Sequence, residues 1–331
     1  MPERIAMTGA TGFVGTHLLR HLLGKGYAVR VLVRDSARLS LPRETADRVE
    51  TVQGALDDDA ALSRLVAGAD VLIHVAGAIA ASTARVFHEV NAEGTRRLAE
   101  RAADADVGRF VHVSSLAARA PHLSPYAASK RAGEEKLQEV AASRGLKTVI
   151  VRPPAVYGPG DRATLSLFDQ LSRRLALVPG HGRQRLSLIH VADLATALHH
   201  LATAPSWPVG EVLEIDDGRP GGYAWDELAE LARSVCGRPL RLLHLPRSLV
   251  RLAGTGADAF ARLSGHALVF SAAKVNELYH DDWVARSPKV QDRTDWTPRR
   301  QFAEGFRETL AWYVRAGWLP VARLPADPEN A

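Results

Sequence analysis

Residues 5–23 read IAMTGATGFVGTHLLRHLL, and this stretch decides how the first half of the chain folds. A short apolar run at 5–7 is typical of a buried strand, and the apolar residues after position 12 recur at a helical spacing. Three glycines, Gly9, Gly12 and Gly15, stand where the strand passes into the helix. Glycine permits a tight turn and a close approach of the backbone to a pyrophosphate, while the helix N-terminus supplies oriented N–H groups. In this context the motif predicts dinucleotide binding, although a GxxGxxG motif by itself also fits a flexible turn.

Strand-like and helical segments alternate through the first 152 residues. Continuous runs of Val, Ile and Leu are typical of strands that helices cover on both faces of a sheet. Strand, helix, strand, helix in this order is typical of a doubly wound parallel sheet, so we predict an α/β fold of the Rossmann type. Strands are expected at 5–7, 28–33, 50–52, 71–74, 110–113 and 148–151, and helices at 12–23, 59–66 and 84–103.

The pattern changes after Arg152, where prolines and glycines interrupt the chain and helical segments become dominant. Two strand-like runs return at 187–189 and 212–215, and at least one of them is expected to rejoin the main sheet. We predict a dinucleotide-binding domain at 1–152, to which residues 185–203 return, and a smaller, mostly helical substrate lobe at 153–331.

Tyr126 and Lys130 stand four residues apart in the segment YAASK. Positions i and i+4 lie on one face of a helix, so the phenol and the ammonium can share one site. A phenol ordinarily has a pKa of about 10 and is a poor base at neutral pH. A positive charge nearby favours the phenolate and brings Tyr126 into a range useful for acid–base catalysis. The pair predicts proton exchange at a carbonyl or alcohol beside a nicotinamide.

Arg34 follows the second strand, where sites specific for NAD usually carry an acidic residue for the ribose hydroxyls. An arginine at this place can pair with a 2′-phosphate, so NADP is the predicted cofactor. Asp35, the next residue, is compatible with NAD, and an exposed charge at the end of a strand is the other interpretation of Arg34.

Composition excludes several classes of protein. With 331 residues, of which 46% are hydrophobic, the chain can bury a sizeable core. No apolar run approaches the roughly 20 residues needed to cross a bilayer, and little chain precedes the first strand to form a signal peptide. The formal charge of +5 is spread along the chain without an aromatic–basic stripe, so nucleic acid is not an expected partner. We predict a cytoplasmic protein that acts on a small molecule and makes no integral membrane contact.

Metal binding is not expected either. Cys236 is the only cysteine, which excludes an intrachain disulfide and a cysteine metal cluster. The acidic run at 57–59 precedes a helical segment and is expected to cap it. The histidines lack the spacing and acidic partners of a metal site and are interpreted as structural: His74, His112, His190, His199 and His200.

In combination, these motifs resemble the extended short-chain dehydrogenases/reductases, the NAD-dependent epimerase/dehydratase superfamily, over nearly the whole chain. Besides the glycine turn and the Tyr–Lys pair, the resemblance rests on HVAG at 74–77, NAEGT at 91–95, VSS at 113–115, RPPAVYGPGD at 152–161, HVAD at 190–193, WTP at 296–298 and WY at 312–313.

The resemblance implies a role for each candidate site residue. Tyr126 is the implied proton donor or acceptor, and Lys130 lowers its pKa and binds the nicotinamide ribose. Ser115 orients the substrate oxygen, with Ser114 as the alternative and a strand-end cap as the structural interpretation of either. The family frequently forms dimers through two helices of each subunit, although no residue in this sequence requires one. The predicted cofactor-binding residues are Gly9, Thr11, Gly12, Phe13, Val14, Gly15, Arg34, Asp35, Ala76, Lys130 and Pro153.

Three positions depart from the sugar-nucleotide members of the superfamily. Pro154-Ala155 stands where those enzymes usually carry an asparagine, and Leu186 where they often carry an arginine, although Arg185 adjoins it. Ala55 replaces an aspartate that often contacts the adenine side of the cofactor. Together the departures favour a less polar substrate, nearer the 3β-hydroxysteroid dehydrogenase and dihydroflavonol-reductase-like branches.

We therefore expect an NADP(H)-dependent oxidoreductase that interconverts a ketone and a secondary alcohol on a small, fairly apolar substrate through a Ser–Tyr–Lys site. A nucleotide-sugar epimerase or dehydratase with internal cofactor recycling is one alternative, and a non-catalytic dinucleotide-binding protein is another. The segment 240–270 mixes apolar residues with Arg241, Arg247, Arg251 and Arg262. It fits a substrate lid, a membrane-surface segment or ordinary amphipathic packing, and we favour packing.

Overall fold

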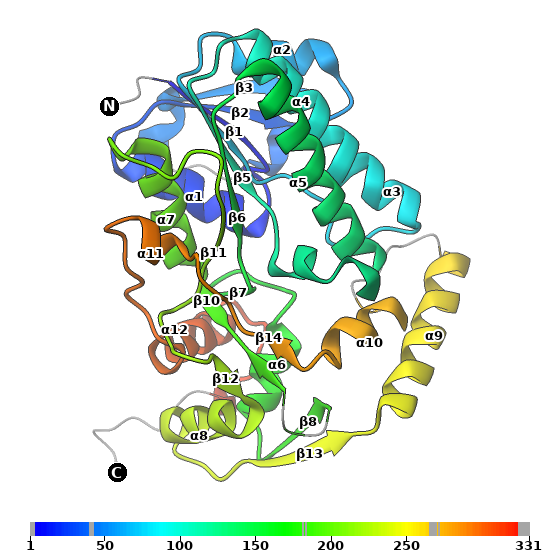
Figure 1. The fold of residues 1–331 in the computed structure, drawn as a ribbon. Coiled ribbons are helices and arrows are strands. Elements are labelled where there is room, and N and C mark those ends of the chain that lie inside the picture. The colour runs from blue at the N-terminus through cyan, green and yellow to red at the C-terminus, as the bar shows by residue number, and fades with distance from the viewer. Residues whose placement is uncertain are drawn as a thin grey trace. The chain divides into compact units, whose positions relative to one another are not determined.

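The computed structural model describes residues 4–39, 43–180, 182, 184–264, 270 and 272–323. The chain divides into two compact units, and Figure 1 shows their elements. Unit 1 comprises Met1–Pro153, Leu194–Ile215 and Arg286–Thr297, and unit 2 comprises Pro154–Asp193, Asp216–Ala285 and Pro298–Ala331. The predicted division at residue 152, with a return at 185–203, stays a prediction. The sequence analysis did not predict that the segment 286–297 belongs to unit 1.

Unit 1 is built on a parallel sheet of seven strands, which confirms the predicted fold class. The strand order is β11-β6-β5-β4-β1-β2-β3, so the direction in which the chain adds strands reverses beside β1. In open sheets of this kind, ligands bind beyond the carboxyl ends of the strands at the reversal, here between β1 and β4. The strands are β1 Ile5–Thr8, β2 Val29–Val33, β3 Val49–Gln53, β4 Val71–His74, β5 Arg109–Val113, β6 Thr148–Arg152 and β11 Val212–Glu214.

Helices cover both faces of this sheet (Figure 1). On one face, leucines and alanines of α2, α4 and α5 pack against β-strand residues such as Leu72 and Phe110 in one continuous core. Asp58 accepts a hydrogen bond from the backbone N–H of Ala61, which confirms the predicted cap of α2. The helices are α1 Phe13–Gly24, α2 Asp59–Val66, α3 Ala84–His88, α4 Gly94–Asp104, α5 Pro125–Arg144, α7 Val191–Thr203 and α11 Val290–Arg293, with short helical turns η1 Ser36–Arg38, η2 Arg43–Arg48, η3 Glu89–Glu93, η4 Leu116–Arg119 and η5 Pro121–Leu123.

Unit 2 has its own core, in which aromatic rings stack around Phe168. Gly305 on α12 allows a close contact, because a Cβ there would lie 2.4 Å from the hydroxyl of Tyr157. The strand-like run at 187–189 pairs with β7 inside this unit, and only β11 rejoins the main sheet. The elements are β7 Ala155–Tyr157, α6 Leu165–Leu171, β8 Leu175–Pro179, β9 Arg185–Leu186, β10 Leu188–His190, β12 Tyr223–Ala224, α8 Trp225–Cys236, β13 Arg241–Leu245, α9 Arg247–Ser264, α10 Ala272–Leu278, β14 Asp282–Trp283, α12 Phe302–Arg315 and η6 Val321–Arg323.

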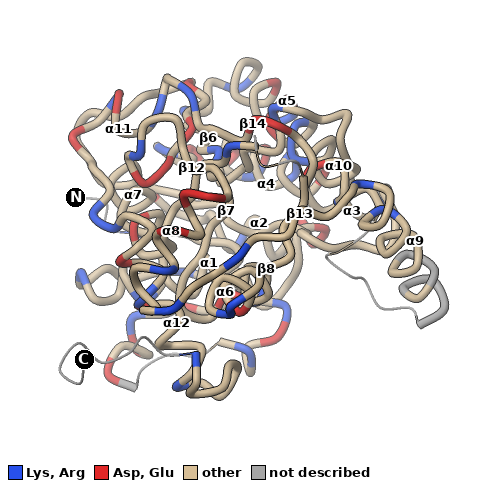
Figure 2. The backbone as a smooth tube through the Cα atoms, turned by 90° about the horizontal axis from the view of Figure 1, so that it is seen from below, with Lys and Arg blue, Asp and Glu red and all other residues tan. Residues whose placement is uncertain are grey.

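Charges of both signs are interspersed over the backbone (Figure 2). Within the described ranges, no helix is both long enough and apolar enough to span a bilayer.

Candidate active site

The glycine turn closes onto the loop that follows β4. Gly9 has a φ of +78°, and a Cβ on it would lie 2.6 Å from the backbone nitrogen of Ala76. A Cβ on Gly15 would lie 2.0 Å from the carbonyl oxygen of Gly9, and the N–H of Gly12 donates to that same oxygen at 2.9 Å. Any side chain at position 9 or 15 would therefore push the turn away from β4 or α1 away from the turn.

The start of α1 suits an anionic group. Gly12 is the N-cap and offers no side-chain cap, and the first turn carries no acidic residue. The first N–H groups of a helix have no partner within it and carry a partial positive charge. Thr11 and Gly12 are exposed, and Phe13 and Val14 are half-buried. This end of α1 fits the pyrophosphate of a dinucleotide, with its backbone N–H groups as the donors.

A buried polar chain holds the loop after β4 in place. The hydroxyl of Thr8 lies 2.7 Å from Nδ1 of His74, whose Nε2 lies 3.0 Å from the hydroxyl of Thr95. The N–H of Ala76 donates to Oγ1 of Thr8 at 3.2 Å. Burial lowers the pKa of His74 to about 3, so its ring is neutral at physiological pH. The structural interpretation of His74 is confirmed, and its partners fix the predicted cofactor residue Ala76.

Three more of the histidines interpreted as structural also have contact partners. His112 stacks on His74 with ring centroids 5.1 Å apart. His199 lies 3.0 Å from His21, and His200 pairs with Asp295 at 2.9 Å. In the part of the chain that the structure describes, no group of His, Cys, Asp or Glu could hold a metal ion.

Helix α5 presents Tyr126 and Lys130 one turn apart. Ser124 caps the helix by accepting from the N–H of Ala127 at 3.0 Å, and proline at the first helical position fits the cap. Tyr126 therefore lies in the first turn, half-buried, with its ring edge-on to Phe87 at 6.0 Å. Lys130 is buried, and its Nζ donates to the carbonyl oxygen of Val113 at 2.9 Å. The ammonium thus lies at the carboxyl end of β5, next to the two serines.

The two serines after β5 are in different surroundings. Ser114 is buried, and its hydroxyl donates to Glu134 at 2.5 Å. Ser115 is half-buried, and its oxygen accepts from the N–H of Ala117 at 3.2 Å as the cap of η4. The proton of Ser114 is therefore used in the bond to a carboxylate. The oxygen of Ser115 is an acceptor in its bond to Ala117, which leaves the hydroxyl able to donate to another group.

Glu134 is the residue that sequence reasoning missed. It lies one turn after Lys130 on α5 and receives two hydrogen bonds from the guanidinium of Arg152, at 2.8 and 2.5 Å. Burial lowers the pKa of Lys130 to about 8, and the charge of Glu134 opposes that shift. The spacing of four residues between Lys130 and Glu134 was the available signal, since it places both charges on one helical face.

Asn91 joins the loop after β4 to α5. Its amide both accepts from the N–H of Ala78 at 2.7 Å and donates to the Ala78 carbonyl at 3.0 Å, and it also donates to Ser129 at 2.9 Å. It lies in the π-helical turn η3, and a Cβ on Gly133 would lie 2.4 Å from its carbonyl oxygen. The side chain of Asn91 therefore holds the loop at 76–78 against the helix that carries Lys130.

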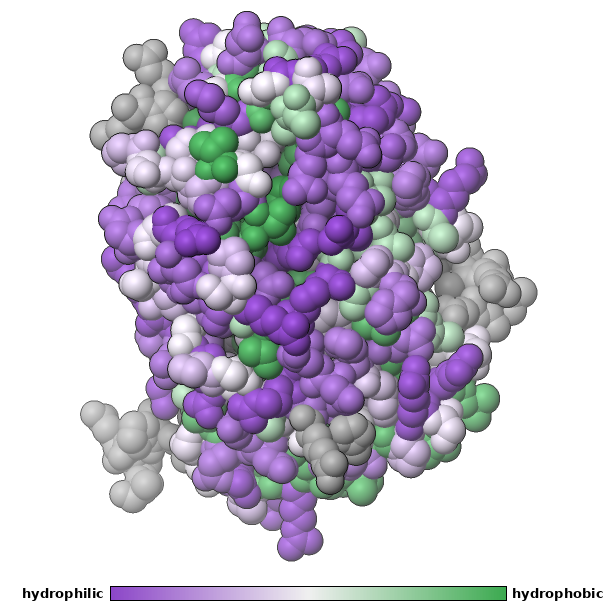
Figure 3. Space-filling model, in the orientation of Figure 1, coloured by the Kyte–Doolittle hydropathy of each residue, from purple (hydrophilic) through white to green (hydrophobic). Residues whose placement is uncertain are grey.

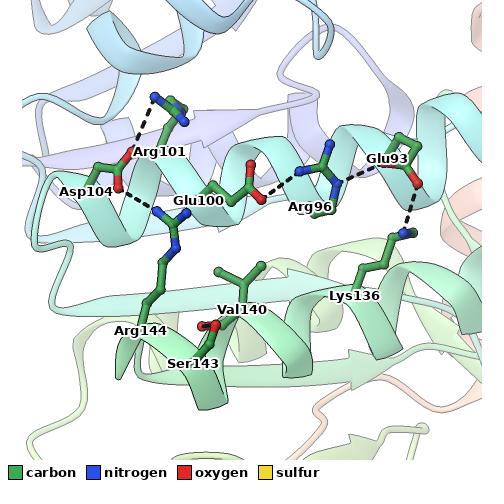
Figure 4. Close-up of polar contacts among 9 residues, drawn as sticks. All are labelled: Glu93, Arg96, Glu100, Arg101, Asp104, Lys136, Val140, Ser143 and Arg144. Atoms are coloured by element: carbon green, nitrogen blue, oxygen red, sulfur yellow. Dashed lines mark hydrogen bonds and ion pairs between the residues drawn. The ribbon is translucent and has the colours of Figure 1, made fainter.

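The solvent side of α5 is tied to α4 by ion pairs (Figure 4). Lys136 and Arg96 both pair with Glu93, at 2.9 Å each, and their hydrogen bonds lower the pKa of Glu93 to about 2. Arg144 pairs with Asp104 at 2.6 Å further along the two helices. These contacts join the solvent side of α5 to η3 and α4.

The remaining predicted residues lie at the carboxyl ends of other strands. Arg34 directly follows β2 and is exposed. The carboxylate of Asp35 accepts from the N–H of Ala37 at 3.0 Å, as the cap of η1. The carbonyl of Pro153 accepts from the N–H of Leu116 at 2.8 Å, which links the end of β6 to η4. All predicted site residues thus lie in unit 1, beyond the carboxyl ends of its strands or at the start of α5.

The sequence profile of the NAD dependent epimerase/dehydratase family matches residues 5–215. The chain belongs to this family. A protein named ceramide reductase from Caulobacter vibrioides (strain NA1000 / CB15N) is 43% identical over 317 residues, which cover 96% of each chain. A ketoreductase for a farnesyl dihydroquinoline oxide from Stigmatella aurantiaca is 34% identical over 66% of this chain and 69% of its own.

Solved structures of more distant proteins show the same fold. A dTDP-glucose 4,6-dehydratase from Streptomyces venezuelae, bound to NAD, has a TM-score of 0.70 at 23% identity and covers 96% of this chain and 99% of its own. A UDP-glucuronic acid 4-epimerase from Bacillus cereus has a TM-score of 0.73 at 18% identity, over 95% and 99%. The protein is an NAD(P)-dependent oxidoreductase of the extended short-chain dehydrogenase/reductase type, and its cofactor is a nicotinamide dinucleotide.

Replacing Gly15 by alanine should remove cofactor binding, because the new Cβ would overlap the carbonyl of Gly9. We expect the affinity of Gly15→Ala for NADPH and NADH, measured by calorimetry, to fall by at least about tenfold, a cost of about 1.4 kcal/mol. Gly24→Ala is the matched control, since nothing lies within 4 Å of a Cβ at this other glycine of α1. Wild-type affinity in a folded Gly15→Ala protein would contradict the assignment of the turn.

Replacing Glu134 by glutamine should lower the pKa of Lys130 below about 8, because the nearby negative charge that favours the ammonium is lost. We expect a downward shift of about one unit, followed through the Lys130 Cε resonance in an NMR titration. At a pH between the Lys130 pKa values of the variant and the wild type, the variant would then carry less positive charge beside Tyr126. Glu139→Gln, at an exposed position on the same helix, should leave the titration unchanged.

Proposed function

We propose that the protein is an NADP(H)-dependent reductase that interconverts a ketone and a secondary alcohol on an apolar, lipid-like molecule. The observation that carries the proposal is the 43% identity, over 96% of both chains, with a protein named ceramide reductase. The Tyr–Lys pair and the serine after β5, to which the family resemblance assigns the chemistry, are all present in this sequence.

The names of two further relatives support the proposal that the substrate is a ketone and that it is apolar. The relative from Stigmatella aurantiaca is named for the reduction of a ketone on a farnesyl-bearing ring. A relative from Stenotrophomonas maltophilia, 29% identical over 66% of this chain, is named 2-alkyl-3-oxoalkanoate reductase. Both names combine a reductase with a substrate that carries a hydrocarbon chain.

Observations in unit 2 argue against a nucleotide-sugar substrate. Arg185 adjoins the place where sugar-nucleotide members often carry an arginine for the diphosphate. Its guanidinium donates to the carbonyl oxygens of Gly221 and Gly222, at 2.6 and 3.1 Å, and pairs with Glu227 at 3.2 Å. This arginine is therefore used to hold the turn before β12, and Leu186 beside it offers no charge.

The reduced cofactor, when bound, supplies a hydride to the carbonyl carbon. In this proposal the hydroxyl of Tyr126 gives a proton to the carbonyl oxygen, so that the C=O π bond is replaced by one C–H and one O–H bond. Ser115 donates a hydrogen bond to the same oxygen and stabilises the negative charge that develops on it. Its geometry supports this choice over Ser114, whose proton is bound to Glu134.

The Lys130 ammonium makes the proton transfer easier. Its charge stabilises the tyrosinate that remains after Tyr126 has given up its proton, and Tyr126 is then reprotonated from solvent. Because the ammonium is held by the carbonyl of Val113, its position relative to α5 and β5 is fixed before substrate binds. The pKa of about 8 keeps most of the charge in place at neutral pH.

The preference for NADP is supported by the surroundings of Arg34. The guanidinium is exposed at the end of β2, where it could pair with a 2′-phosphate. Asp35, which favours NAD in the opposite interpretation, is already used as the cap of η1. The carboxylate that would bind the ribose hydroxyls of NAD therefore has another role.

Tyr126→Phe tests the reaction. We expect the rate of NADPH-dependent reduction of a long-chain 3-oxo amide or 2-alkyl-3-oxoalkanoate, followed by mass spectrometry of the alcohol, to fall by at least about a hundredfold. NADPH affinity should be retained, since the phenol acts on the substrate oxygen. Turnover at the wild-type rate would refute the role of Tyr126. Release of tightly held NAD⁺ from denatured protein, with micromolar binding of a UDP- or dTDP-sugar, would favour the epimerase alternative instead.

Arg34→Ala tests the cofactor preference. Loss of the guanidinium should lower the affinity for NADPH by about tenfold or more, because NADPH carries the 2′-phosphate. The affinity for NADH, which lacks this phosphate, should stay within about twofold of the wild-type value. Calorimetric titration with each dinucleotide measures the ratio of the two affinities. Arg20→Ala, on the exposed side of α1, is the matched control. An equal loss of affinity for both dinucleotides would show that Arg34 does not bind the 2′-phosphate.

A further inference from the structure

Helix α9 of unit 2 exposes an apolar stripe. Leu249, Leu252 and Phe260 are 58%, 71% and 60% exposed in the chain as a whole. Leu249 and Phe260 are eleven residues apart, about three helical turns, so they lie on one side of the helix with Leu252 beside them. Gly254, on the other side, is buried. The helix therefore faces its unit with small and half-buried residues and turns its largest apolar side chains outward.

The two-stranded sheet that precedes α9 in the chain also turns large apolar side chains outward. Strands β8 and β13 are parallel, with Leu175 opposite Arg241 and Leu177 opposite Leu243. These four residues share the outer face, and the three leucines are 52%, 43% and 51% exposed. The alternate residues of β8 point into the core of unit 2. β13 ends at Leu245 and α9 begins at Arg247, so the two exposed apolar faces belong to elements that follow one another directly in the chain.

We name this face the α9–β13 surface and define it by Leu175, Leu177, Leu243, Leu249, Leu252 and Phe260. Figure 3 shows apolar (green) atoms over β8 and over the lower part of α9, between hydrophilic side chains. The favoured expectation of ordinary amphipathic packing is wrong for the three members on α9. The side chain of Arg262 and residues 265–269 lie outside the described part of the chain.

The charges around the α9–β13 surface are almost all positive. Between residues 239 and 271 the sequence holds four arginines, at 241, 247, 251 and 262, and one acid, Asp258, which is a net charge of +3. Arg174, Arg241 and Arg251 are exposed, and among the described residues none of them pairs with a carboxylate. Arg247 binds the neutral side chain of Asn276 at 2.9 Å. Arg174, Arg241 and Arg251 are therefore exposed where an anionic partner could reach them.

We propose that the α9–β13 surface binds the face of an anionic lipid bilayer. Exposed leucine and phenylalanine side chains on a helix, flanked by arginines, are typical of segments that lie in the membrane interface. The apolar side chains would enter the acyl boundary, and the arginines would pair with lipid phosphates and acidic headgroups. An apolar face edged by a net positive charge fits this partner better than a neutral protein surface.

The inference goes beyond the proposed function and does not depend on it, since membrane binding requires no turnover. The two are compatible, because a ketone on a lipid-like molecule would reside in the bilayer to which this surface binds. A failure of either can be recognised separately, since vesicle binding and ketone reduction are measured in different assays.

Co-sedimentation with vesicles tests the proposal. We expect the full-length protein to bind vesicles of phosphatidylcholine mixed with phosphatidylglycerol, and to bind pure phosphatidylcholine more weakly. The variant Leu249→Ser/Leu252→Ser/Phe260→Ser should bind the anionic vesicles at least about tenfold less. Arg241→Gln/Arg251→Gln should lose about 25-fold in affinity for the anionic vesicles, at about fivefold for each arginine, and most of the salt dependence. Val209→Ser/Val321→Ser, at exposed apolar positions outside the surface, is the matched control.

Three results would overturn the proposal. The first is absence of wild-type binding to either kind of vesicle. The second is wild-type binding by the folded triple-serine variant, with folding checked by thermal melting. The third is a dimer, seen by light scattering, that the triple-serine variant converts to a monomer, because the surface would then be covered by a second copy of the chain. Reduction of a water-soluble ketone by the triple-serine variant should match the wild type, which excludes damage to the site in unit 1.

Discussion

The buried ammonium of Lys130 is the constraint around which the site in unit 1 is arranged. Removing a charge from water is unfavourable unless the charge is paired and hydrogen-bonded. Here the carbonyl of Val113 accepts from it, and Glu134 lies one turn away on the same helix. Glu134 in turn needs Arg152, which the end of β6 supplies. One positive charge thus determines how α5, β5 and β6 meet.

The same constraint explains why small residues gather where α5 meets its neighbours. Gly133 and Gly77 both lie against Asn91, which leaves room for the helix to come close to the loop after β4. Asn91 spans that contact with three hydrogen bonds. The dinucleotide turn, the loop after β4 and the helix with Tyr126 are therefore connected through polar groups that are nearly all buried.

Local signals in the sequence were sufficient for most of unit 1. The bounds of α2 were predicted to the residue, and the acidic run before it contains the cap, because helix ends are specified by short-range chemistry. The glycine turn was recognisable for the same reason. The ion pair of Glu134 with Arg152 was not, because it joins a helix to a strand and no periodicity encodes which distant charges will meet.

Unit 2 was harder to predict for a related reason. The run at 187–189 looks like any buried strand, and its partner β7 is chosen by tertiary packing and not by its own residues. Likewise, the amphipathic pattern of α9 indicates that the helix has an apolar side, but periodicity cannot tell which side faces the protein. Exposure of Leu252 is visible only in three dimensions.

The chain of hydrogen bonds through His74 has a fixed direction. The N–H of Ala76 donates to Thr8, so the Thr8 hydroxyl can direct its own proton at Nδ1 of the imidazole. At the other end, Thr95 donates to the carbonyl of Asn91 and so accepts from Nε2. The ring is therefore the Nε2–H tautomer, and the backbone groups at the two ends dictate it. Every hydrogen bond in this chain points the same way, so each bond polarises the next, and electrostatics as well as packing orient the loop after β4.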